Sequence, residues 1–235
     1  MQAPDRYSPP PMTASRLRAN ARVARAPGNS IRGPATREMC AFAAAMARGD
    51  AASAARALDA ARRARCPRRA AEETALMLML YAGFPGALEG LRVLNATWPG
   101  RARRTREGTP ASWRRRGLAL CARVYGPAIS RLLPAVRALH PDLEVWMVEH
   151  GYGRVLARSG LAARERELIT VAALAALGWE RQLVSHVLGA LRTGARAAEV
   201  HEALGLGARA GGERERAIAG RTWARVERQA AAGSS

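Results

Sequence analysis

Residues 164–191, RERELITVAALAALGWERQLVSHVLGAL, constrain the fold more than any other stretch of the chain. A charged cluster opens an apolar run that extends from Leu168 to Trp179 and is rich in Ala and Leu, which favour helices. Gly178 interrupts this run before a second helical pattern from about Glu180 to Arg192. The stretch therefore predicts an αα-hairpin over 161–193.

Composition extends the prediction of an all-α fold to the rest of the chain. The 235 residues are 49% hydrophobic but only 5% aromatic, so the core has to be built mainly from Ala, Leu and Val. Further helices are expected over 36–64 with a break at 48–50, from near Pro67, beyond Pro85, and over 119–138, 141–157 and 196–204. Ser159 is the expected N-cap of the hairpin's first helix.

Charge, cysteine spacing and apolar run length bear on the protein's partners and location. The net charge is +19, yet all 38 basic residues are arginine and many alternate with acids, so a nucleic-acid partner is not favoured. Cys40, Cys66 and Cys121 lie far apart and form no CxxC, which fits a reducing, cytoplasmic location. The longest apolar run falls short of the roughly 20 residues that span a membrane, so no membrane association is expected.

An offset of 129 positions superimposes two parts of the sequence. It places Arg37-Glu38 on Arg166-Glu167, Gly49 on Gly178 and Glu73 on Glu202. The position of His186 is Ala57 in the first copy, which makes that copy degenerate. The segment YAGFP (81–85) has no sequence counterpart in the second copy, so we expect the second copy to lack this packing tail.

The repeat leads to a division of the chain into five parts. Residues 1–34 are expected to form a disordered basic segment, although the acid-free stretch 13–27 also fits a transit peptide. The first helical module covers 35–98, a linker 99–118, the second helical module 119–210 and a C-terminal helical tail 211–235.

Residues 151–204 and the segment YAGFPGALEGLRVL (81–94) resemble the carboxymuconolactone decarboxylase family, which includes the alkylhydroperoxidase D-like proteins. The resemblance implies an all-α fold of duplicated helical-hairpin modules and a homo-oligomer, a trimer or hexamer. Peroxidase members of the family carry a glutamate, a CxxC pair and a histidine. Glu167 and His186 match the first and last, whereas Trp179 and Gln182 stand at the cysteine positions, which excludes thiol peroxidase chemistry.

The resemblance to the decarboxylase branch implies a cofactor-free lyase without a metal, acting on a small carboxylated lactone or oxo-acid. Histidine titrates near neutral pH, so His186 is the candidate proton donor and acceptor, with Glu167 as its partner. Arginine binds carboxylates in a bidentate manner, which makes Arg166, Arg164 and Arg154 candidate substrate clamps. Trp179 and Gln182 are candidates for the pocket lining.

A second interpretation stays open at this point. His186 lies among apolar residues and Glu167 in an Arg/Glu run, as a core histidine and a surface carboxylate would. In an antiparallel hairpin the two side chains differ in height by about 5 Å, so contact is allowed but not dictated. The alternative is a non-catalytic oligomeric scaffold or ligand-binding relative, in which Tyr81 and Phe84 serve packing.

Overall fold

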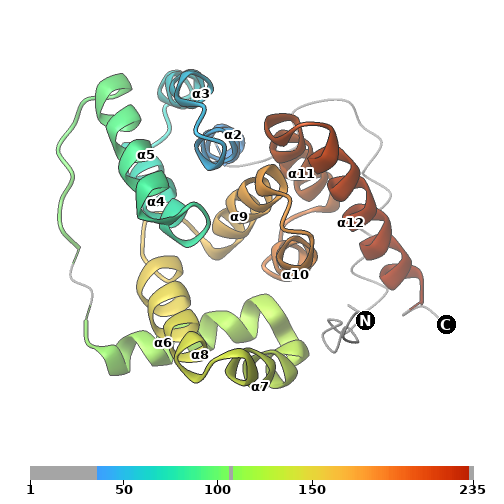
Figure 1. Ribbon diagram of the computed structural model, residues 1–235. Coiled ribbons are helices and arrows are strands. Elements are labelled where there is room, and N and C mark those ends of the chain that lie inside the picture. Colours follow the sequence, from blue (N-terminus) through green and yellow to red (C-terminus); the bar gives the residue numbers. More distant parts are fainter. Residues whose placement is uncertain (1–35, 106–107, 233–235) are drawn as a thin grey trace.

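The computed structural model describes residues 36–105 and 108–232, with side chains to 229. The basic segment predicted for 1–34 lies outside these residues. The described part is helical and contains no strand, which confirms the all-α prediction (Figure 1). Within it, no helix combines the length and apolar character that crossing a bilayer requires.

The helices form three groups along the chain. The first group consists of α2 (Thr36–Ala47), α3 (Ala51–Arg63), α4 (Arg68–Met77), the short η1 (Leu78–Leu80) and α5 (Gly83–Thr97). The second consists of α6 (Pro110–Tyr125), η2 (Gly126–Ala128), α7 (Ile129–Leu139), α8 (Pro141–Trp146) and the π-helical η3 (Met147–Leu156). The third consists of α9 (Ala163–Leu177), α10 (Glu180–Arg192), α11 (Ala197–Gly211) and α12 (Glu213–Ala232).

The predicted αα-hairpin is formed by α9 and α10, and Gly178 ends α9 with a left-handed φ of 72°. The expected cap at Ser159 is wrong, because α9 begins only after Ala162. The Glu165 carboxylate accepts a hydrogen bond from the Ala162 N–H at 2.7 Å and so caps the helix from its own first turn.

The third group repeats the first at the offset of 129 positions. Shifted by that offset, α3 coincides with α10 at both ends and α4 starts where α11 starts. Gly49 and Gly178, the equivalent turn residues, both have φ of 72°. The helix pairs also pack alike, α2 on α3 as α9 on α10, and α4 on α5 as α11 on α12.

This correspondence corrects two sequence predictions. Residues 211–235 were expected to form a tail, and the second copy to lack the packing helix of the first. Instead α12 packs on α10 and α11, in the place that α5 holds in the first copy. The second copy thus keeps the packing helix although it lacks the YAGFP sequence.

The linker predicted over 99–118 is also too long. Its second half belongs to α6, which begins at Pro110 behind a capping box in which Thr109 and Ser112 exchange backbone and hydroxyl hydrogen bonds. Pro110 looks like a turn residue in the sequence, but proline is equally suited to the first position of a helix.

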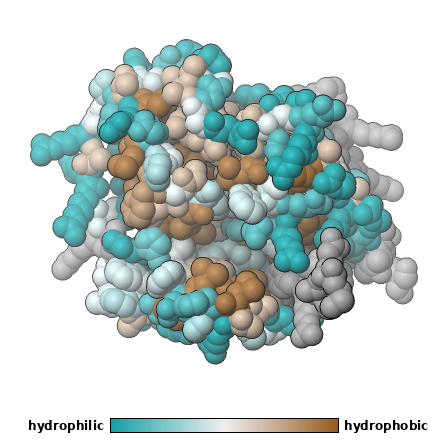
Figure 2. All heavy atoms as spheres, viewed as in Figure 1, coloured by the Kyte–Doolittle hydropathy of each residue, from teal (hydrophilic) through white to brown (hydrophobic). Residues whose placement is uncertain are grey.

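Within the middle group, α6 and η3 make an unusually close helix contact. A Cβ on Gly117 of α6 would lie 2.0 Å from the Val148 carbonyl oxygen, and one on Gly153 of η3 would lie 2.0 Å from that of Trp113. Both positions therefore need glycine for α6 and η3 to approach. Figure 1 shows this group beside α9 and α10, while Figure 2 shows apolar patches between hydrophilic side chains on the same face.

Two ion pairs related by the repeat join the two copies. Arg166 Nη2 of α9 lies 3.0 Å from Glu73 Oε2 of α4, and Arg37 Nε of α2 lies 2.8 Å from Glu202 Oε1 of α11. Each arginine lies in the first turn of the first helix of its copy, and each glutamate belongs to the opposite copy. The first pair is buried, whereas the Arg37 side chain is 39% exposed.

Glu73 is the better-connected carboxylate of the two. Its side chain is fully buried and also pairs with Arg69 at 2.6 Å and Arg158 at 3.1 Å. Three guanidinium groups thus converge on one carboxylate between the copies. Removal of its charge would leave buried cations without a counter-ion.

We predict that Glu73→Gln lowers the free energy of unfolding by about 3–5 kcal/mol, because it removes one partner of buried ion pairs. The matched change Glu202→Gln, in the more exposed pair, should cost about 1 kcal/mol or less. Equilibrium urea unfolding of the two variants checks this. Equal losses would contradict the assignment of Glu73 as the main link between the copies.

Candidate functional site

Glu167 of α9 and His186 of α10 meet inside the predicted hairpin. His186 Nδ1 donates to Glu167 Oε2 at 2.9 Å, and the residues are 8% and 2% exposed. The offset in height expected from an ideal hairpin is therefore closed. A carboxylate at Nδ1 holds the ring in one orientation and leaves Nε2 as the atom for proton exchange.

Gly189 makes this contact possible. A Cβ at this position would lie 2.6 Å from Glu167 Oε2 and 2.7 Å from Val124 Cγ1 of α6. The equivalent residue of the first copy is Ala60, three residues after Ala57, which stands at the histidine position. The second copy thus has both the imidazole and the space for its partner.

Two tyrosines of the middle group complete the surroundings of the pair. The ring of Tyr125 in α6 meets His186 edge-on, with centroids 6.2 Å apart. Its hydroxyl lies 2.5 Å from that of Tyr152 in η3. Burial raises the pKa of Tyr152 well above its usual value, and the nearby Tyr125 and Glu167 raise it further. The Tyr152 phenol therefore stays neutral and able to donate a hydrogen bond.

Sequence reasoning missed these tyrosines, since nothing in the repeat points to the middle group. The one available signal was the position of Tyr152 between Gly151 and Gly153, inside the stretch that carries the family resemblance.

Tyr81, expected to be a packing residue, has a polar role as well. Its hydroxyl lies 2.6 Å from that of Thr170, which in turn donates to the Arg166 carbonyl at 2.8 Å. Burial raises the pKa of Tyr81, the hydrogen bond to Thr170 lowers it, and Glu167 raises it. Tyr81 thus brings a neutral hydroxyl from the first copy to α9, near Glu167. Phe84, also expected to be a packing residue, is 68% exposed and lines a cavity.

Two of the three candidate substrate clamps are held by the protein itself. Arg166 is 1% exposed, pairs with Glu73 and donates to the carbonyls of Arg158 and Ser159. Arg164 pairs with Glu199. Both guanidinium groups are thus held in ion pairs with glutamates of the protein itself.

Arg154 lies apart from them, in η3. Its guanidinium sits over the ring of Trp113, 5.1 Å from the centroid. It also lines a cavity of about 210 Å³ together with Phe84 and His150. This cavity lies between the middle group and η1–α5, and neither Glu167 nor His186 lines it.

Trp179 and Gln182 lie on the same stripe of α10 as His186, seven and four residues before it. Trp179 is 58% exposed and Gln182 is exposed, so the stripe leads from the surface to the buried imidazole. No residue within 36–105 or 108–229 hydrogen-bonds to His186 Nε2. In the same part of the chain, no three His, Cys, Asp or Glu side chains are placed to hold a metal ion.

Residues 141–225, from α8 into α12, match the model of the carboxymuconolactone decarboxylase family. The match includes Glu167 and His186 and confirms the resemblance over the second copy; the similar segments of the first copy lie outside it. No curated protein sequence matches the chain.

We predict that Gly189→Ala destabilises the protein by about 1–3 kcal/mol, because the new methyl group collides with Glu167 and Val124. In an unhindered helix the same change would stabilise by up to about 1 kcal/mol. Gly220→Ala on α12 provides the control, since a Cβ there meets nothing within 4 Å. Urea unfolding measures both changes, and a stabilised Gly189→Ala variant would refute the close contact.

We predict that the thiols of the folded protein resist alkylation. Burial raises the pKa of Cys66 to about 11 and that of Cys121 to about 12, and the charges of Glu38 and Glu167, respectively, raise these pKa values further. Thiolate is the reactive form, so iodoacetamide at pH 8 should modify Cys121 at least about a hundredfold more slowly in the native protein than in urea. Mass spectrometry over time checks this, and equally fast labelling would contradict it.

Proposed function

We propose that the chain is a cofactor-free lyase of the carboxymuconolactone decarboxylase type, acting on a small carboxylated lactone or oxo-acid. The observation that carries the proposal is the Glu167–His186 hydrogen bond, which occupies Nδ1 and leaves Nε2 without a partner among the described residues. The match of residues 141–225 to the family model supports the same chemistry.

In the proposed reaction, the C–C bond to the leaving carboxylate breaks and its electron pair stays on the substrate as a dienolate while CO₂ departs. Protonated His186 then gives the proton on Nε2 to the substrate carbon and regains one from water. Glu167 stabilises the imidazolium and holds the ring in place. Tyr125 lies beside the ring, and its hydroxyl shares a hydrogen bond with that of Tyr152, so the pair offers a polar group near the imidazole.

Substrate binding falls to the stripe of α10 in this proposal. Gln182 lies one turn before His186 and offers an amide donor, and Trp179 covers the outer end. Arg154 stays a candidate for the carboxylate. Arg166 and Arg164 are no longer included, because both serve ion pairs of the fold.

We predict that His186→Gln lowers the rate of CO₂ release from carboxymuconolactone by at least about a hundredfold, the usual contribution of a general acid–base residue. Glu167→Gln should lower it less, because the imidazole stays in place but its cation loses stabilisation. His140→Gln, at the exposed start of α8, is the control. Unchanged turnover in His186→Gln would overturn the assignment.

Two observations favour the alternative of a non-catalytic oligomeric scaffold. His186 is only 8% exposed, and Leu139 and Trp146 of α7 and α8 present apolar side chains that are 79% and 63% exposed. Such residues suit contact with a second copy of the chain, in a trimer or hexamer. An oligomer by sedimentation that releases no CO₂, with or without His186, would favour this function.

A further inference from the structure

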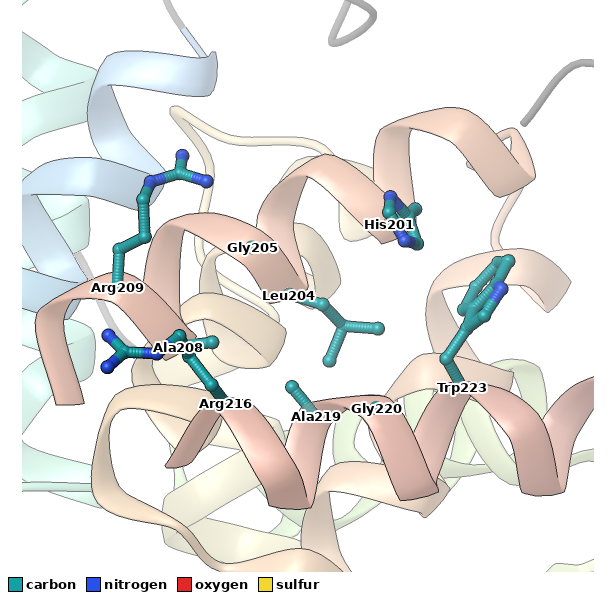
Figure 3. A pocket seen from close by; sticks show the side chains of 9 residues that line it. All are labelled: His201, Leu204, Gly205, Ala208, Arg209, Arg216, Ala219, Gly220 and Trp223. Atoms are coloured by element: carbon teal, nitrogen blue, oxygen red, sulfur yellow. The ribbon is translucent and has the colours of Figure 1, made fainter. Parts of the chain in front are cut away.

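The second copy contains a groove that is separate from the Glu167–His186 pair. A cavity of about 300 Å³ lies between α11 and α12 (Figure 3). Its apolar surface includes the buried side chains of Leu204, Ala208 and Ala219. Gly220 leaves space on α12, where a Cβ would meet no atom within 4 Å, whereas a Cβ at Gly205 of α11 would lie 3.2 Å from Arg209 Nη1.

The first copy shows that the fold does not require this groove. At the offset of 129, Leu76 stands at the position of Gly205 and Leu91 at that of Gly220. Leu94, equivalent to Trp223, is fully buried in the core. Larger side chains thus stand at these positions in the first copy, where Leu76 lines the separate cavity beside Arg154.

The two ends of the groove differ in charge. Figure 3 shows Arg209 and Arg216 toward one end and His201 and Trp223 at the other. Neither arginine side chain forms a hydrogen bond or an ion pair with the described residues, and no carboxylate lines the groove. Two guanidinium groups without counter-ions at the mouth of an apolar groove favour an anionic ligand.

The opposite end is closed by a fixed aromatic wall. The rings of His201 and Trp223 meet edge-on with centroids 5.3 Å apart. The Trp223 indole N–H donates to the Glu227 carboxylate at 2.9 Å, which holds the ring in position. From His201 to Arg209 the groove follows eight helical residues, a length of about 12 Å.

We propose that this groove binds an unbranched aliphatic carboxylate of about eight to ten carbons. The chain lies along Leu204, Ala208 and Ala219 and ends against Trp223, while the carboxylate meets Arg209 and Arg216. An extended chain of this length is about as long as the helical rise from His201 to Arg209. The proposal does not depend on activity at His186.

The test is isothermal titration calorimetry of decanoate into the full chain, with decanol as the uncharged counterpart. Saturable binding of decanoate at one site per chain is expected, with decanol at least tenfold weaker. Gly220→Leu, which copies Leu91 of the first module, should abolish binding while thermal unfolding stays unchanged or moves upward. The double variant Arg209→Gln/Arg216→Gln should weaken decanoate binding at least tenfold and leave decanol unaffected.

Arg228→Gln, an exposed position of α12 outside the groove, controls for the loss of positive charge and should bind as the unmodified chain does. Absence of saturable binding to the unmodified chain would overturn the proposal, as would full binding by Gly220→Leu. If Gly220→Leu does not fold, the arginine double variant decides alone. A lower oligomer mass of Gly220→Leu by sedimentation, without decanoate binding to the unmodified chain, would assign the groove to a second copy and also overturn it.

Discussion

The buried ion pair between Arg166 and Glu73 is the contact on which the arrangement of the site depends. It fixes the start of α9 against the first copy, through a carboxylate that is fully buried and shared with Arg69 and Arg158. Successive residues of a helix point about 100° apart. With Arg166 directed at the first copy, Glu167 is directed at α10 and reaches His186. One Arg-Glu dipeptide thus joins the two copies and positions the carboxylate of the site.

The same dipeptide has a different result in the first copy. Arg37 pairs with Glu202 as Arg166 pairs with Glu73, so the arginine of the dipeptide binds the opposite copy in both cases. The glutamate of the dipeptide has a different role in the first copy. Ala57 stands at the position of His186, so Glu38 has no imidazole to contact. The contact between copies therefore does not require a histidine. The contacts of His186 are instead with Glu167 and Tyr125.

At three positions the copies diverge in the same direction. In the second copy, glycine stands where the first has Ala60, Leu76 or Leu91, and each glycine leaves space, for the Glu167 carboxylate or for the α11–α12 groove. The first copy fills the equivalent positions and contributes packing, together with the Tyr81 hydroxyl. The middle group adds Tyr125 and Tyr152 from outside the repeat. The candidate site thus takes side chains from all three groups of helices, with the Glu167–His186 pair in the third.

The sequence by itself determined the helices, the αα-hairpin, the repeat and the identity of Glu167 and His186, because these depend on local helix preference, on Gly178 and on residue spacing. The sequence misplaced the cap of α9 at Ser159 and made the linker too long, because Pro110 suits a turn as well as a helix start. It also took α12 for a tail, because its sequence differs from that of α5. Only the tertiary structure decided that Glu167 touches His186, that Tyr125 and Tyr152 stand beside them, and that Arg166 and Arg164 belong to the fold. Those outcomes depend on how helices from distant parts of the chain approach one another. That approach is set by contacts such as Gly189 against Glu167 and Arg166 against Glu73, which no local pattern encodes.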